Sequence, residues 1–201
     1  MFISFEGIDG SGKSTQARIL ADYLKSKGKD VILTREPGGS TGAEAIRALL
    51  VEGETDRWSA ETEILLFNAA RRDHLEKTIQ PALNAGKIVI TDRFADSTHI
   101  YQGVARADLS KFVSEIHKLA IGVDPDLTFI IDADPEESLS RGLARNSGED
   151  RFEDFGLKFQ QDIRNGFLEL SKSQKRFKRI NGMQGIDEVA AEVSTIMDQF
   201  L

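Results

Sequence analysis

The sequence predicts an α/β fold in which a five-stranded parallel sheet carries helices on both faces. Short apolar runs rich in β-prone residues recur along the chain, at 2–5, 31–33, 88–90, 127–131 and, more weakly, 177–180. Patterns with helical spacing lie between and after them, at 13–27, 42–51, 59–85, 110–121, 135–145, 152–173 and 186–200. Nearly all-apolar strands that alternate with helices are typical of a parallel sheet buried on both faces. The 201 residues contain no repeat or linker, so we expect one domain over 1–201.

A glycine-rich loop follows the first apolar run. Residues 7–14 read GIDGSGKS and match the pattern G-x-x-x-x-G-K-[ST] between a predicted strand and a predicted helix. In such a loop, backbone N–H groups and the helix N-terminus surround a phosphate. Lys13 supplies positive charge to the β and γ phosphates, and the Ser14 hydroxyl is placed to ligate Mg²⁺. The sequence therefore predicts a nucleoside triphosphate site formed by Gly7, Ile8, Asp9, Gly10, Ser11, Gly12, Lys13, Ser14 and Thr15.

Composition excludes several classes of partner. The net charge of −7 argues against a nucleic-acid polymer, because binding to its backbone needs a basic face. The chain has no cysteine, which rules out disulfides and thiolate metal sites and fits a reducing cytoplasm. No signal-peptide pattern opens the sequence, and no apolar run approaches a membrane span. We expect a cytoplasmic protein that binds neither nucleic acid nor membrane.

Charged and polar residues follow the ends of the predicted strands, at 6–13, 34–36, 92–93 and 132. Ligands of open parallel sheets bind outside the carboxyl ends of the strands, so these segments are expected to converge on one crevice. Asp92 lies where an acid that orients a magnesium-bound water is expected, directly after a buried strand.

The glycine loop by itself is shared by GTPases, motor ATPases and small-molecule kinases. A GTPase would show an Asn-Lys-x-Asp segment after a later strand, and a large ATPase would be longer and carry a second acidic pair; neither is found. Phosphoryl transfer depends mainly on positioning and charge neutralisation, which several scattered arginines can supply. The pattern favours a nucleoside monophosphate kinase that clamps two phosphate-bearing substrates with Arg35, Arg71, Arg93, Arg141, Arg145 and Arg151.

Four blocks of sequence resemble the bacterial thymidylate kinase family, in its order and at its spacing. They are FEGIDGSGKSTQ at 5–16, TREPGG at 34–39, TDRF with DS and YQG within 91–103, and DRFE at 150–153. The resemblance implies the P-loop NTPase fold of nucleoside monophosphate kinases, with a small lid. It also implies transfer of the γ-phosphoryl group of Mg·ATP to dTMP, giving dTDP for dTTP biosynthesis.

The resemblance implies which residues hold the phosphate and sugar of dTMP. Asp9 would bind the 3′-hydroxyl and a magnesium-bound water, and Arg93 would grip the phosphate. A guanidinium at the end of a strand is well placed for such a two-point contact. Tyr101 would crowd C2′ and reject ribonucleotides. Together with Ser14 and Asp92, Asp9 makes up the expected metal site.

The resemblance also implies how the base is read. Phe67 would stack on thymine and Arg71 would hydrogen-bond its O4; the two are four residues apart and share a face of a predicted helix. Ser97 and Gln102, in an expected polar turn, would read the pyrimidine edge. The other expected acceptor-side residues are Arg35, Glu36, Pro37 and Thr98.

A connection rich in Gly, Asn and Ser at about 141–153 is expected to form a lid that closes over ATP. One subtype of the family carries a catalytic arginine in the P-loop and the other carries it in the lid. Here the P-loop has no arginine, so the lid subtype is implied. Arg141 would flank adenine, and the expected catalytic residues are Lys13, Asp9, Arg93, Arg145 and Arg151.

Members of the family are commonly homodimers, and the resemblance implies the same here. A stripe at 159, 163, 167 and 170 has helical spacing and indicates either core or a dimer face. Two other functions stay open: a kinase for another nucleotide or deoxynucleoside, and a nucleotide-binding switch without a small acceptor. Arg71 and Gln102 argue for thymine against the first. The three histidines have no metal-ligand spacing, and we assign them no chemistry.

Overall fold

The computed structural model describes residues 1–54, 56–106, 108–143 and 156–201. Its centre is a five-stranded sheet in the order β2-β3-β1-β4-β5, in which every neighbouring pair is parallel. This confirms the predicted fold class. The strands are β1 (Phe2–Glu6), β2 (Val31–Arg35), β3 (Ile88–Asp92), β4 (Leu127–Asp132) and β5 (Phe177–Asn181).

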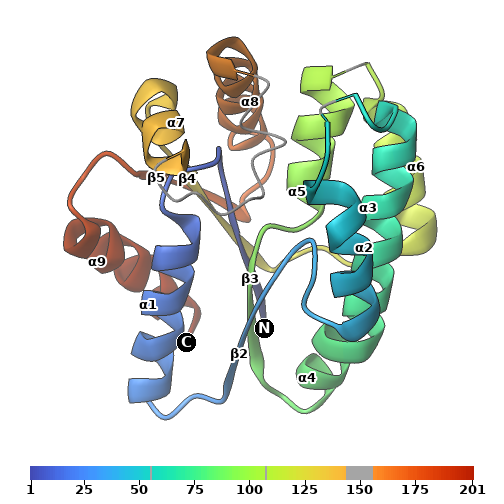
Figure 1. Cartoon of the computed structure of the whole chain (residues 1–201). Helices are drawn as coiled ribbons and strands as arrows, with labels where there is room; N and C mark the ends of the chain where they lie inside the picture. The colour runs from blue at the N-terminus through green and yellow to red at the C-terminus, as the bar shows by residue number, and fades with distance from the viewer. Residues whose placement is uncertain (55, 107, 144–155) are drawn as a thin grey trace.

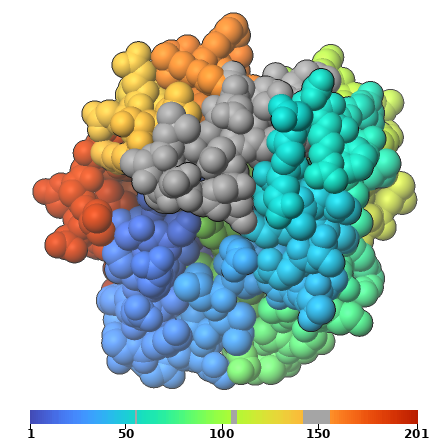
Figure 2. Space-filling model, viewed as in Figure 1, coloured from blue at the N-terminus to red at the C-terminus, as the bar shows by residue number. Residues whose placement is uncertain are grey.

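Helices cover both faces of this sheet (Figure 1). One face carries α1 (Lys13–Ser26) and α9 (Ile186–Met197), and the short η4 (Asp198–Phe200) ends the chain. The other helical segments are α2 (Thr41–Val51), α3 (Ala60–His74), η1 (Leu75–Ile79), α4 (Gln80–Asn84), α5 (Ala95–Thr98), η2 (His99–Arg106), α6 (Ser110–Ala120), α7 (Pro135–Leu143) and α8 (Gly156–Leu170). The space-filling view from the same side shows α1 and the α2–α3 pair on opposite sides of one face of the molecule (Figure 2).

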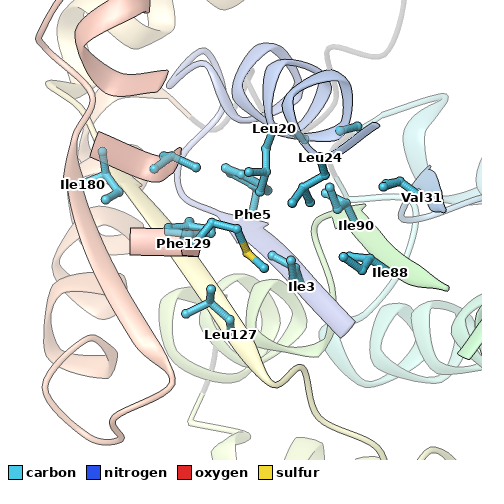
Figure 3. Close-up of a cluster of buried hydrophobic side chains, with 14 of the residues drawn as sticks. Ile3, Phe5, Leu20, Leu24, Val31, Ile88, Ile90, Leu127, Phe129 and Ile180 are labelled. Atoms are coloured by element: carbon cyan, nitrogen blue, oxygen red, sulfur yellow. The ribbon is translucent and has the colours of Figure 1, made fainter. Parts of the chain in front are cut away.

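Apolar side chains on both faces of the strands explain why the sheet is buried. All residues of β1 and β4 are buried, as nearly continuous apolar strands predict. Between the sheet and α1, Leu20 and Leu24 pack with Phe5 and Ile90 (Figure 3). On the opposite face, Phe159, Ile163 and Phe167 of α8 are buried against the sheet and η2, so the stripe at 159–170 belongs largely to the core.

The structure corrects two local predictions. Residues 97–102, expected to form a polar turn, are helical and belong to α5 and η2. A contact with a residue distant in the chain helps to hold this segment. Arg176, ahead of β5, donates two hydrogen bonds of 2.8 Å to the buried carboxylate of Asp96. The predicted helix at 59–85 is also divided, into α3, the π-helical η1 and α4.

The expected lid lies mostly outside the described residues. Only its first residues, at the end of α7, are described, while Arg145, Arg151 and the block at 150–153 are not. In the part of the chain that is described, no helix has the length and apolar character needed to cross a bilayer.

Candidate active site

The glycine loop joins β1 to α1 and is held closely by its surroundings. Lys13 is buried, and its Nζ donates a 2.6 Å hydrogen bond to the backbone oxygen of Ile8. Burial and the nearby Arg93 lower the pKa of Lys13 to about 8, against the opposing pull of neighbouring carboxylates. Gly10 has a φ of 76°, and a Cβ there would come within 1.9 Å of the backbone oxygen of Ser138 in α7. Only glycine fits this position.

Ser14 and Asp92 meet at the carboxyl end of β3. The Ser14 hydroxyl donates to Oδ2 of Asp92, while Oδ1 of the same carboxylate is buried and has no hydrogen-bond partner among the described residues. A hydroxyl beside a carboxylate oxygen with a free lone pair suits a hard divalent cation. Among the described residues, no group of three or more His, Cys, Asp or Glu side chains is arranged to hold a metal ion. Mg²⁺ takes many of its ligands from water and phosphates, so one hydroxyl and one carboxylate can be enough protein ligands for it.

A cavity opens beside the glycine loop, between α2, α3 and the α5–η2 segment. Every predicted acceptor-side residue except Arg35 lines it. Arg35 instead pairs with Glu44 of α2 at 3.1 Å and is exposed. The lining consists of Asp9, Glu36, Pro37, Arg47, Val51, Phe67, Arg71, Arg93, Phe94, Ser97, Thr98, Tyr101 and Gln102.

Arg93 links the glycine loop to this cavity. Its Nη1 donates to the backbone oxygen of Gly7 at 3.1 Å and to the Ser97 hydroxyl at 2.8 Å, and its Nη2 donates to Asp9 at 2.6 Å. Tyr101 donates to the other oxygen of Asp9 at 3.0 Å. Burial alone would raise the pKa of Asp9, but Arg93 and Lys13 outweigh it and lower the pKa to about 2. Asp9 is therefore ionised at neutral pH.

The backbone of Arg93 is unusual. Its φ is 69°, and among the described residues it is the only non-glycine with a positive φ. Such a conformation is costly and persists where surrounding contacts impose it. Here the contacts come from Glu6, which accepts from the backbone N–H of Phe94 at 2.7 Å and from the Ser97 hydroxyl at 2.6 Å. Burial, followed by the nearby Asp96, raises the pKa of Glu6 to about 8.

On the other wall, a buried chain of hydrogen bonds holds Arg71. Its Nε donates to Glu36 at 2.7 Å, and its Nη2 donates to Thr98 at 3.0 Å. Glu36 also accepts from His74 Nδ1 at 3.0 Å, and Thr34 lies 2.7 Å from the second nitrogen of that ring. Since a carboxylate can only accept, Nδ1 carries the proton. The peptide bond between Glu36 and Pro37 is cis.

Comparison with known proteins agrees with this geometry. The family model described as thymidylate kinase matches residues 5–193. The chain belongs to the thymidylate kinase family. It is 61% identical over 198 residues to a thymidylate kinase of Ruegeria pomeroyi, covering 98% of this chain and 94% of that protein. It is 65% identical over 192 residues to one of Dinoroseobacter shibae, covering 95% and 93%.

A solved structure of the same family is similar to this chain. The crystal structure of thymidylate kinase from Ehrlichia chaffeensis superposes with a TM-score of 0.81 at 37% identity, covering 98% of each chain. As a thymidylate kinase, the chain is a nucleoside monophosphate kinase that phosphorylates dTMP with ATP as phosphoryl donor. This is the predicted activity, and it removes the alternative of a nucleotide-binding switch without a small acceptor.

Several residues at the site were not predicted from the sequence. Arg47 and Val51 of α2 line the cavity. They are four residues apart on a predicted helix, and this spacing could have indicated that they share one face. Glu6 and His74 stand behind the cavity rather than in it. Glu6 lies in the block at 5–16 but was given no role, and His74 lies in no motif. Arg141, expected near adenine, is exposed and pairs with Glu137 at 3.0 Å.

Proposed function

We propose that the cavity holds dTMP and that the glycine loop holds the ATP phosphates, so that the two phosphate chains meet at Arg93. The observation that carries this assignment is the position of one guanidinium, which contacts Gly7 and Asp9 of the loop and also lines the cavity. A fixed arginine between two anions lowers their repulsion before any bond forms.

In this assignment an oxygen of the dTMP phosphate attacks the γ-phosphorus of ATP. A new P–O bond forms, the bond to the β–γ bridging oxygen breaks, and ADP leaves with that oxygen. The acceptor phosphate is already an anion, so no strong general base is required. Lys13 and Arg93 neutralise charge on the transferring group, and Arg145 and Arg151 are the expected further contributors. Arg141 is expected to flank the adenine ring.

We assign Mg²⁺ to Ser14 and Asp92, and Asp9 is the further residue expected to hold a coordinated water. The free Oδ1 of Asp92 and the Ser14 hydroxyl support this choice. The cation would neutralise charge on the β and γ phosphates.

The base of dTMP is assigned to the wall formed by α3 and η2. Phe67 offers an aromatic face and Arg71 a fixed donor for O4, while Ser97, Thr98 and Gln102 supply polar groups. Tyr101, hydrogen-bonded to Asp9, is assigned to exclude a 2′-hydroxyl. Glu36 and Pro37 complete the wall from the opposite side, and Arg35 is expected to approach from outside the cavity.

A homodimer remains part of the proposal. Large apolar side chains are exposed on α3 and on two helices that contact it: Leu65 on α3, Leu49 on α2 and Leu119 on α6, the last 83% exposed. Sedimentation velocity measures the oligomeric state directly. A cytoplasmic location, with no nucleic acid or membrane as partner, stays a prediction from the sequence.

An ADP-release assay with several acceptors tests the substrate. With Mg·ATP present, we expect dTMP to give faster ADP release than dUMP, dCMP, dGMP or AMP. Acceleration by AMP and not by dTMP would overturn the acceptor assignment. Omission of Mg²⁺ and its replacement by Ca²⁺ test the cation in the same assay.

A further inference from the structure

Glu63 is a fully buried carboxylate on the wall of α3 that the phosphoryl transfer does not use. It precedes Phe67 by four residues and Arg71 by eight, so all three lie on the side of α3 that faces the cavity region. Its partner across the gap is Gln102 of η2, whose Nε2 donates to Glu63 Oε2 at 3.2 Å. Gln102 is also fully buried and lines the cavity.

This contact fixes which end of the Gln102 amide faces the cavity. An amide carries two N–H donors at one corner and an acceptor oxygen at the other, whereas a carboxylate can only accept. Glu63 therefore draws the NH₂ group toward itself and turns the oxygen away. In agreement, Oε1 of Gln102 is buried and has no hydrogen-bond partner among the described residues. A buried acceptor of this kind is costly unless a ligand supplies a donor.

The second polar group of the wall is Arg71, which can only donate. Its orientation is fixed by Glu36 at 2.7 Å and by Thr98 at 3.0 Å, one turn before Gln102. The cavity thus presents a donor and an acceptor to a bound base. Thymine presents an acceptor at O4 beside a donor at N3–H and matches this order. Cytosine presents an amino donor at C4 beside an acceptor at N3, which is the reverse.

We propose that Glu63 is a specificity-determining positioning residue: by holding the Gln102 amide, it makes the cavity select pyrimidines that carry N3–H beside a C4 carbonyl. The inference rests on the assignment of the dTMP base to this cavity. Glu63 does not touch the substrate; it acts through Gln102.

The test replaces Glu63 with glutamine, which accepts as well as donates and so leaves the Gln102 amide free to turn. For Glu63→Gln we expect the ratio of kcat/KM for dTMP to that for dCMP to fall at least tenfold, with KM for ATP unchanged. The matched control is Glu61→Gln, which makes the same exchange at an exposed position on the same helix and should leave the ratio unchanged. Equal losses for both pyrimidines, or no change in either, would overturn the proposal.

A second variant separates this effect from damage to the fold. In Glu63→Gln with Gln102→Glu, the amide at 63 donates to the carboxylate at 102, whose other oxygen still accepts toward the base. The preference for dTMP over dCMP should return to within a few-fold of the wild-type ratio, and a ratio as low as in the single variant would overturn the role. If the wild-type protein shows no dTMP-dependent ADP release, the assignment of the dTMP base to the cavity fails. If the wild-type protein is active with dTMP and only the Glu63 variants differ from expectation, the base assignment stands and the role of Glu63 is wrong.

Discussion

His74 and Arg71, three residues apart on α3, are joined through the carboxylate of Glu36. Arg71 donates to one oxygen at 2.7 Å and His74 to the other at 3.0 Å, and all three side chains are almost completely buried. Arg71 and His74 cannot shift independently, because both are hydrogen-bonded to the same Glu36 carboxylate. Gly39 packs so closely on His74 that a Cβ there would lie 2.4 Å from its Nε2. His74 therefore lies behind Arg71, the residue that we assign to the base.

Exchange of His74 tests this relationship. Asparagine places an N–H donor near Nδ1 of the replaced ring, whereas glutamine reaches only the position of Nε2. We expect His74→Gln to raise KM for dTMP about tenfold, since Glu36 loses a buried hydrogen bond worth about 1.5 kcal/mol, and His74→Asn to stay within about threefold of wild type. Initial rates at saturating ATP measure both. If both variants raise KM equally, the contact between His74 and Glu36 does not orient Arg71.

Arg93 is predicted to matter more for the acceptor than for the donor. Arg93→Ala should raise KM for dTMP about 100-fold, as expected from losing one or two charge-assisted hydrogen bonds of about 1.5–3 kcal/mol each. KM for ATP should change by no more than a few-fold, because the glycine loop keeps its other donors. The comparison is a pair of substrate titrations on the same preparation.

Arg72→Ala serves as the matched control for Arg93. Arg72 is exposed, pairs with Glu76 in the next turn and does not line the cavity. Its removal should leave both KM values near wild type. Equal increases in the two KM values of Arg93→Ala would contradict the assignment of the dTMP phosphate to Arg93.

Glu6 gives a prediction about pH. Its pKa is about 8 in the folded protein, against an ordinary value of about 4.5, so the folded state binds more protons than the unfolded state between these values. The contribution of Glu6 to the free energy of unfolding is then fully present below pH 4.5 and is lost as pH rises through 8. Relative to Glu6→Gln, wild type should lose up to about 1.4 kcal/mol per pH unit in this window.

Urea unfolding of both proteins at pH 5, 6.5 and 8 measures this difference. All other titrating groups are common to the two proteins, so the change with pH isolates position 6. A stability difference that stays constant across the three pH values would show that Glu6 is ionised throughout.

The local sequence was sufficient for the elements whose signal is local. The strands at 2–6 and 127–132 are apolar runs, and the glycine loop is a contiguous motif, so each was predicted close to its observed position. The helical segment at 95–106 was missed because its conformation depends on Arg176, 80 residues from Asp96. The roles of Glu6 and His74 were missed for a similar reason. The role of a buried glutamate or histidine depends on its hydrogen-bond partners, and folding brings these partners together.

The sequence by itself determined the fold class and the phosphate loop, which depend on periodicity, on a contiguous motif and on the rule that parallel strands end on one side of a sheet. The resemblance to the family implied most, but not all, of the residues that line the cavity. Only the tertiary structure decided which hydrogen-bonding atom each of those residues presents. Arg71 is aimed by Glu36, Arg93 by Glu6 through Ser97, and Gln102 by Glu63. The direction of a hydrogen bond belongs to a pair of side chains, and the members of these pairs are brought together by folding alone.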